Sequence, residues 1–219
     1  MPEVITIEHK ILKKNADIAL ENRARFDDAG VFVVGLVSSP GSGKTSLLER
    51  TLQLLQGRAR CAVIEGDVQT DNDARRIAAL GVPAVQIVTN GTCHLEARMV
   101  QEALPQVDLA GLDLLFVENV GNLVCPSSYE LGEHVRVVLA STTEGEDKPL
   151  KYPAMFRKSQ VLVMNKVDLL PYVPFDLAKA RSYALQVNPE LRVFETSCTT
   201  GQGLAAWADW LLAERGKRR

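Results

Sequence analysis

The segment Ser38-Ser39-Pro40-Gly41-Ser42-Gly43-Lys44-Thr45 constrains the fold more than any other feature of the chain. It follows the apolar run 31–37 and precedes an amphipathic stretch, an order that predicts a strand, a tight loop and a helix. Small residues let backbone N–H groups surround phosphate oxygens, and the helix N-terminus adds the positive end of its dipole. The sequence therefore predicts a phosphate-binding loop, although Ser38 stands where the usual pattern has Gly.

Side chains within this loop carry the specific chemistry. Lys44 is predicted to reach the outer phosphates of a nucleotide, and the Thr45 hydroxyl to ligate Mg²⁺. The predicted nucleotide contacts in the loop are Ser39, Gly41, Ser42, Gly43, Lys44, Thr45 and Ser46. A glycine-rich turn that binds nothing is the alternative, and the order of strand, loop and helix argues against it.

Composition and charge limit the classes of partner that the chain is expected to bind. The chain has 219 residues and a net charge of −2, which fits one α/β domain and suggests neither nucleic acid nor an anionic membrane as a partner. No apolar run is long enough to span a bilayer and the N-terminus lacks a signal-peptide pattern, so a cytoplasmic location is predicted. The four cysteines then favour thiols or metal ligands over disulfides.

Apolar runs alternate with amphipathic stretches, which is typical of a parallel sheet covered on both faces. Strands are expected at 31–37, 61–64, 84–88, 112–117, 135–140, 160–164 and 191–194, and helices at 45–55, 71–80, 95–104, 176–186 and 204–214. We predict an α/β, three-layer P-loop NTPase fold with a mostly parallel sheet in domain 30–215. An N-terminal helical segment, 1–29, is expected to contribute one or two turns, and 216–219 a basic tail.

A second motif, Asn165-Lys166-Val167-Asp168, follows the apolar run 160–164. The Asp168 carboxylate can accept hydrogen bonds from guanine N1–H and the 2-amino group, donors that adenine lacks there. A buried acceptor left unpaired costs about 1–3 kcal/mol, so such a site selects guanine. Asn165 is expected to brace the base loop or the phosphate loop, and the stem of Lys166 to lie over the base. A helix-capping turn is the alternative, which the upstream phosphate loop disfavours.

The turn 195–199 follows the last apolar run and precedes a glycine-rich step at 201–203. In GTPases such a turn presents backbone N–H groups to guanine O6. Ser197 and Cys198 are the predicted nucleotide contacts, and a plain strand-to-helix turn is the alternative.

Two acids close predicted strands at the carboxyl edge of the sheet, where ligands of open α/β sheets bind. Glu118 is predicted to contact Mg²⁺ through water, and Asp67 to ligate Mg²⁺ or position the attacking water. With Lys44 and Thr45 they form the predicted catalytic set. The N–H of Gly121 is expected to approach the γ-phosphate, as switch loops do. For each acid a helix cap or exposed strand end is the alternative. Slow hydrolysis is expected, because no arginine finger or water-orienting Gln can be assigned.

Cys93-His94 and Cys125 are candidate metal ligands, because two soft thiolates and an imidazole suit Zn²⁺ or Ni²⁺. Their spacing alone is weak evidence, since no Cys-x-x-Cys pair exists. Cys61 is expected in the core and Cys198 in a structural role. His9 and His134 are interpreted as ordinary surface or packing residues.

Taken in order, these motifs resemble those of the HypB family, the SIMIBI-class nickel-incorporation GTPases of hydrogenase maturation. The matching stretches are 38–49, 64–76, 90–97, 118–126, 144–153, 165–172 and 195–203. The resemblance implies Mg²⁺-dependent GTP hydrolysis and help in delivering nickel to [NiFe] hydrogenase large-subunit precursors, together with other maturation proteins. It also implies that Cys93, His94 and Cys125 bind Ni²⁺ or Zn²⁺ at a homodimer interface promoted by GTP and metal.

Two departures limit the resemblance. Neither the Cys-rich motif nor the His-rich run of many members precedes the first predicted helix, so metal storage through such an extension is not predicted. The related urease accessory GTPase has Cys-Pro-His where this chain has Cys125-Pro126-Ser127, which favours the hydrogenase branch. A urease-type or other metallocentre-assembly GTPase, a GTP-regulated scaffold without metal cargo and a small-molecule kinase are the alternatives.

Cys125 follows Gly121 by four residues, so a switch that senses the γ-phosphate would move Cys125 relative to the other two ligands. Metal affinity would then depend on GTP versus GDP. The loop 144–149 is expected to contact a dimer partner or phosphate, or to be a solvated acidic loop. The apolar stretch 169–173 would serve a dimer or the core.

Overall fold

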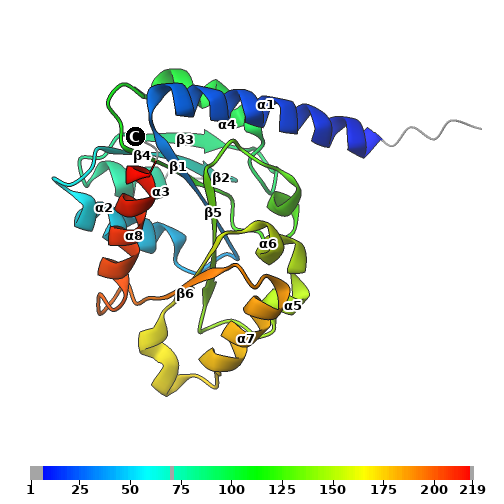
Figure 1. Ribbon diagram of the computed structural model, residues 1–219, viewed down its shortest axis with the longest axis vertical. Helices are drawn as coiled ribbons and strands as arrows, with labels where there is room; N and C mark the ends of the chain where they lie inside the picture. Colours follow the sequence, from blue (N-terminus) through cyan, green and yellow to red (C-terminus); the bar gives the residue numbers. More distant parts are fainter. Residues whose placement is uncertain (1–6, 70–71, 218–219) are drawn as a thin grey trace, which may run out of the picture.

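The apolar runs form the strands of one parallel sheet in the computed structural model, which describes residues 7–69 and 72–217 (Figure 1). The strands are β1 (Phe32–Ser38), β2 (Cys61–Asp67), β3 (Ala84–Val88), β4 (Leu114–Glu118), β5 (Val135–Ser141), β6 (Val161–Asn165) and β7 (Arg192–Glu195). Their order is β3-β2-β4-β1-β5-β6-β7, with every neighbouring pair parallel. The central strands are buried along their whole length, which explains why they read as continuous apolar runs.

Helices cover both faces of this sheet (Figure 1). They are α1 (Ile7–Ala29), α2 (Lys44–Leu55), α3 (Asn72–Ala78), α4 (Ala97–Ala103), α5 (Lys148–Lys151), α6 (Pro153–Lys158), α7 (Leu177–Val187) and α8 (Leu204–Gly216), with 3₁₀ turns η1 (Leu104–Gln106), η2 (Cys125–Ser128) and η3 (Val167–Tyr172). Val34 and Leu36 of β1 pack in the cluster that includes α2 and α8, whereas Val33 packs in the cluster of α1 and α4. The α/β, three-layer architecture is therefore confirmed.

The N-terminal segment differs from the expectation of one or two helical turns. α1 is a single helix of 23 residues, packed on α4. Its inner face carries Asn15 and Asn22 as well as Ala19 and Phe26, all buried. The asparagines interrupt the apolar periodicity, which hid the length of the helix from the sequence pattern. Residues 1–6 of the predicted segment and 218–219 of the predicted tail lie outside the described residues.

The connection between β5 and β6 holds α5 and α6, which the sequence did not predict. Both are short, at four and six residues, so neither shows a full apolar period. The strands β2 and β4 run further than expected, to Asp67 and Glu118, which places both acids at strand ends. The predicted helix 71–80 is α3, and residue 71 lies outside the described residues.

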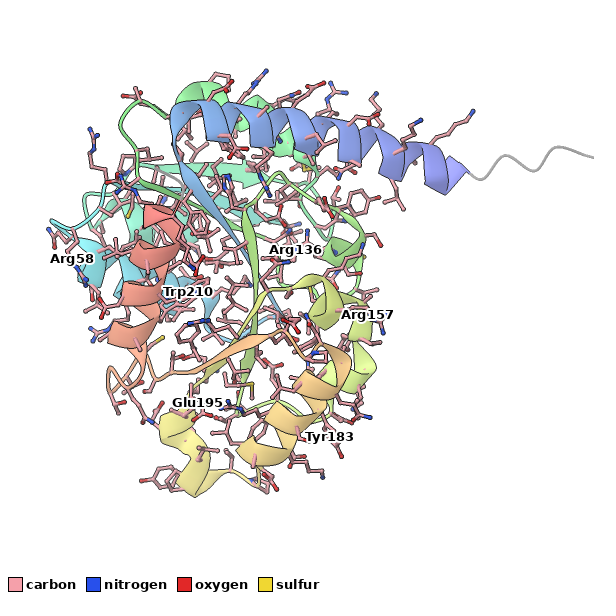
Figure 2. The ribbon with its side chains drawn as sticks, in the orientation of Figure 1. Arg58, Arg136, Arg157, Tyr183, Glu195 and Trp210 are labelled. Atoms are coloured by element: carbon pink, nitrogen blue, oxygen red, sulfur yellow. The ribbon has the colours of Figure 1, made fainter. Side chains whose placement is uncertain are left out.

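Polar and aromatic contacts join the layers. Arg136, labelled beside β5 in Figure 2, is 4% exposed and pairs with Glu133 at 2.6 Å. Trp207 and Trp210 of α8 stack on each other, and Trp207 donates from Nε1 to the Thr51 hydroxyl of α2 at 2.9 Å. Among the helices of residues 7–69 and 72–217, none combines the length and the apolar character of a membrane span.

Candidate functional site

A cleft of about 560 Å³ opens at the carboxyl ends of β1, β2 and β4. The structure brings nine of the predicted site residues to this cleft: Gly41, Gly43, Lys44, Thr45, Ser46, Asp67, Glu118, Gly121 and Lys166. They come from four separate stretches of the chain, which meet because parallel strands end at the same edge. The cleft is thus the place where a nucleotide phosphate chain would lie.

The loop between β1 and α2 has the backbone that phosphate binding requires. Gly41 and Gly43 have φ of 76° and 96°, in the left-handed region that favours glycine. A Cβ on Gly43 would lie 2.6 Å from Nδ2 of Asn165, so this glycine is also required for close approach. Ser38, the departure from the usual pattern, is fully buried, and its Oγ accepts a hydrogen bond from Lys44 Nζ at 3.1 Å.

A buried carboxylate faces the start of α2. Thr45 Oγ1 donates to Glu118 Oε1 at 3.1 Å, and Lys44 Nζ lies 3.9 Å from the same oxygen. Glu118 Oε2 is buried without a hydrogen-bond partner among the described residues. Hydroxyl and carboxylate oxygens are the donors that Mg²⁺ prefers, so Thr45, Asp67 and Glu118 fit this ion.

Glu65 is a site residue that sequence reasoning missed. It lies opposite Glu118 in the register of β2 and β4 and is 2% exposed. Burial, reinforced by the charge of Glu118, raises the pKa of Glu65 to about 10, and burial raises the pKa of Glu118 to about 7. The two neighbouring carboxyl groups therefore retain a proton near neutral pH. The available signal was a charged residue inside an apolar strand.

The motif Asn165-Lys166-Val167-Asp168 is connected to the phosphate loop through Asn165. Its Nδ2 donates to the Ser42 carbonyl at 3.0 Å, and its Oδ1 accepts from the Thr196 hydroxyl at 3.2 Å. The sequence left open whether Asn165 braces the base loop or the phosphate loop, and the side chain contacts both. Cys198 Sγ also donates to Asn165 Oδ1, at 3.5 Å, which places this thiol in a structural position.

Lys166 and Asp168 follow at the end of β6. Lys166 has φ of 64°, and its Nζ donates to the Gly41 carbonyl at 2.7 Å, so the ammonium also holds the phosphate loop. Asp168 is half-buried in η3, and within residues 7–69 and 72–217 its carboxylate has no hydrogen-bond partner. Ser197 is fully buried and shapes the neighbouring turn by accepting the N–H of Thr200 at 3.0 Å.

The three candidate metal ligands lie together. One ligand atom each from Cys93, His94 and Cys125 fall within 4.8 Å of one another, and the two Sγ atoms are 2.9 Å apart. Cys93 is exposed on the loop before α4, whereas Cys125 begins η2 after β4. The hydrogen bond to Cys125 raises the pKa of Cys93, and burial lowers that of His94 and favours its neutral imidazole. Such a soft, neutral-nitrogen set suits Ni²⁺ or Zn²⁺.

The loop 144–149 contacts the phosphate loop. Lys148 Nζ donates to Ser39 Oγ at 2.7 Å and pairs with Glu144 at 3.2 Å, while Glu144 accepts a hydrogen bond from Ser42. Arg76 lines the nucleotide cleft as well, held by ion pairs to Glu49 and Asp73. No local pattern singled out Arg76 in the sequence.

The remaining thiol and imidazole fall into structural positions. Cys61 is half-buried against the core, and burial raises its pKa to about 12. The His134 side chain is fully buried, accepting the Val33 N–H at Nδ1 and lying 2.8 Å from Asp27 through Nε2. His134 is therefore a packing residue, one of the two roles expected for it, and its partners come from distant segments of the chain. The side chain of His9 lies outside what the structure describes.

Comparison with known proteins agrees with this geometry. The family model described as CobW/HypB/UreG, nucleotide-binding domain, matches residues 32–195. The hydrogenase maturation factor HypB of Azotobacter vinelandii is 54% identical over 215 residues, covering 98% of this chain and 71% of that protein. The crystal structure of HypB from Helicobacter pylori in complex with nickel superposes with a TM-score of 0.89 at 38% identity, covering 93% of this chain and 96% of that one. HypB from Archaeoglobus fulgidus gives 0.86 at 37% identity, covering 94% and 100%. The chain therefore belongs to the HypB branch of the CobW/HypB/UreG family of P-loop GTPases.

Proposed function

We propose that this protein is a slow, Mg²⁺-dependent GTPase that carries nickel toward [NiFe] hydrogenase large-subunit precursors, working with other maturation proteins. One observation carries the proposal: the loop that follows β4 serves both halves of the site. Glu118 and Gly121 line the nucleotide cleft, and Cys125 lies among the metal ligands. A change in nucleotide at one end of this loop therefore acts on a metal ligand at the other.

The nucleotide half supports GTP as the substrate. Asp168 offers an unpaired carboxylate within the described chain, the acceptor that the N1–H and 2-amino donors of guanine need. Lys44 and the start of α2 supply positive potential for the phosphates. A Cβ on Gly121 would lie 3.1 Å from Pro40, so the absence of a side chain lets the switch loop approach the phosphate loop. Ser197 and Cys198 support the base-side turn.

Magnesium fits the acidic side of the cleft. Thr45, Asp67 and Glu118 would hold the ion, which supplies charge stabilisation to the phosphate oxygens when it is bound. Lys44 Nζ lies close to Glu118 Oε1, the oxygen that Thr45 also contacts, and would neutralise the charge that develops on the phosphates. Arg76 lines the cleft, but among the described residues it is held by ion pairs to Glu49 and Asp73. It is therefore not assigned as an arginine finger, and slow hydrolysis is expected without one.

The thiol site supports a transferable metal cargo. Cys93 is exposed, so a bound ion would be accessible to an acceptor. A family member from Helicobacter pylori has been crystallised in complex with nickel, which favours Ni²⁺, and the same ligands accommodate Zn²⁺. Three ligands leave a coordination position for water or a second subunit. Val124, 60% exposed beside Cys125, supports a homodimer formed with GTP and metal. The cytoplasm is the proposed location.

The test is a titration of Ni²⁺ and of Zn²⁺ in the presence of GDP and then of a non-hydrolysable GTP analogue. Cys125→Ala is measured beside Cys61→Ala, a control that removes a thiol far from the ligand cluster. We expect nucleotide-dependent binding in the wild type and in Cys61→Ala, and its loss in Cys125→Ala. Binding that is indifferent to both nucleotide and Cys125 would show that the cargo site lies elsewhere.

A further inference from the structure

Two asparagines connect the nucleotide loop to the segment that carries Cys93 and His94. Asn119 Oδ1 accepts the backbone N–H of Leu95 at 3.0 Å, and Asn122 Nδ2 donates to the Cys93 carbonyl at 3.2 Å. Both asparagines belong to the loop that follows Glu118. The backbone around the first two metal ligands is therefore hydrogen-bonded to the switch loop itself.

Each of these asparagines has a fixed position. Asn119 is 2% exposed, and its own N–H donates to the Leu36 carbonyl of β1 at 2.9 Å. Asn122 Oδ1 accepts the N–H of Val124 at 2.9 Å, which orients its amide toward the Cys93 carbonyl. The amide group of each asparagine is therefore held in the orientation that reaches the segment with Cys93 and His94.

The segment is also packed against the end of β2. Leu95 is fully buried, and a Cβ added to Gly66 would lie 2.7 Å from its side chain. Gly66 immediately precedes Asp67 in the cleft. The absence of a side chain at Gly66 thus brings the ligand-bearing segment within contact of the nucleotide site.

Helix α1 holds the other end of the segment through a matching pair. Asn15 Oδ1 accepts the N–H of Ala97 at 2.8 Å, and Asn22 Nδ2 donates to the Ala97 carbonyl at 2.8 Å. These two asparagines contact the start of α4 and do not belong to the switch loop. The segment 93–97 is therefore hydrogen-bonded at one end to α1 and at the other end to the loop that faces the nucleotide.

We infer that Asn119 and Asn122 are positioning residues that transmit the nucleotide state to the backbone of Cys93 and His94, an inference that rests on the proposed function. A buried N–H left unpaired carries the full cost of its desolvation, so the Leu95 N–H stays with the Asn119 side chain when movement of the following loop residues turns that side chain. Because Ala97 is held by α1, that movement changes the spacing of the ligands. The loop thus acts on all three ligands: on Cys125 through the chain, and on Cys93 and His94 through the asparagines.

The experiment measures Ni²⁺ affinity by competition with a chromogenic chelator, once with Mg²⁺·GDP and once with Mg²⁺ and a non-hydrolysable GTP analogue. The ratio of the two affinities is the coupling factor, which is typically about 5- to 150-fold in coupled systems. Asn119→Ala and Asn122→Ala each remove one side-chain hydrogen bond between the loop and the segment 93–97. Asn15→Ala is the matched control, because it removes an amide oxygen from an N–H of the same segment, and within the described part of the chain Asn15 makes no hydrogen bond to residues 119–124. Its own amide donates to the Glu130 carbonyl beyond η2, and Asn22 still holds the Ala97 carbonyl in the variant.

We expect Asn119→Ala and Asn122→Ala each to reduce the coupling factor without abolishing it, because Cys125 stays coupled through the chain, and Asn15→Ala to preserve it. The reciprocal effect of Ni²⁺ on nucleotide affinity must change by the same factor. Thermal melting shows whether each variant folds. If Asn119→Ala does not fold, Asn122→Ala provides the test, because Asn122 is half-exposed.

A folded Asn119→Ala or Asn122→Ala that keeps the wild-type factor would overturn the inference, as would an equal loss in Asn15→Ala. A wild-type factor of unity has a different meaning. It contradicts the nucleotide gating of the proposed function, and the inference falls with it.

Discussion

The nucleotide loops and the metal ligands lie at the same edge of the sheet but are held in different ways. On the nucleotide side, Ser38, Ser42 and Asn165 are at most 1% exposed. Asn165 donates to the Ser42 carbonyl, and Ser38 accepts from Lys44 within the phosphate loop. On the metal side, Cys93 is exposed on a loop whose backbone is held by hydrogen bonds to asparagine side chains. The first region is preorganised, and the second depends on its neighbours for its shape.

This difference follows from what each region must do. Phosphate and guanine are recognised by groups whose positions are set before binding, which rewards buried and fully bonded loops. A metal cargo must be taken up and released, so its ligands need a low cost of rearrangement. When each ligand is measured without the other, mutations at the two regions should therefore separate, with an effect on nucleotide affinity on one side and on metal affinity on the other.

The sharpest separation is expected from Cys93→Ala. Loss of even an outer-shell partner costs about 10- to 100-fold in metal affinity, so loss of a thiolate ligand should cost more than about 100-fold for Ni²⁺. GDP affinity measured without metal should stay unchanged, because the Cys93 side chain does not line the cleft. Chelator competition and a fluorescent-GDP titration measure the two quantities. A parallel fall in GDP affinity would contradict the separation.

The converse is expected from Lys44→Ala. Hydrogen bonds to charged groups are worth about 1.5–3 kcal/mol, and two charged phosphates place this residue at the upper end, a loss of about 100-fold in GDP affinity. Ni²⁺ binding to the nucleotide-free protein should not change. Lys158→Ala, which removes an exposed lysine outside the cleft, is the control and should leave both affinities as in the wild type.

A smaller effect is expected at the base. Asp168→Asn keeps one acceptor oxygen and replaces the other with a donor, so one of two hydrogen bonds to guanine is lost and GDP affinity should fall about tenfold. Xanthine carries a carbonyl at the position of the 2-amino group and should bind the variant better than the wild type does. Equal affinity of wild type and variant for both nucleotides would place the guanine edge away from Asp168.

The contrast also explains what the sequence could predict. The phosphate loop, Asn165 and Asp168 lie in contiguous motifs, because a strand, a turn and a helix fix their neighbours locally. Cys93 and Cys125 are 32 residues apart, and only the pairing of β2 with both β3 and β4 brings their loops together. The sequence therefore identified the candidate metal ligands but did not give the distances between them.

Other residues carried weaker signals. Glu65 was readable as a charge within an apolar strand, although its partner Glu118 emerges only from strand register. Asn119 and Asn122 are ordinary loop residues by composition, and their role depends on the backbone of a distant segment. The inner asparagines of α1 concealed the length of this helix, although a helical segment was predicted there, and they hydrogen-bond to the backbone of distant segments.

The proton shared by Glu65 and Glu118 predicts a change in the pH dependence of stability rather than in an affinity. The pKa of Glu65 in the folded protein, about 10, lies above its ordinary value of 4.5, so the folded state keeps a proton that the unfolded chain releases. This stabilisation is complete below the ordinary pKa and is lost as the pH rises toward about 10. One such proton lowers the free energy of unfolding by at most about 1.4 kcal/mol per pH unit.

Glu65→Gln should therefore flatten the pH dependence, because the amide resembles the protonated acid and does not titrate. Urea unfolding of the nucleotide-free, Mg²⁺-free protein between about pH 5.5 and about pH 8.5 measures the slope. Part of the slope should persist, since Glu118, with its pKa raised by burial to about 7, still titrates in the variant. Glu190→Gln, which neutralises an exposed glutamate, should keep the wild-type slope. If Glu65→Gln kept the full wild-type slope, the proton that the folded protein retains would not lie on Glu65.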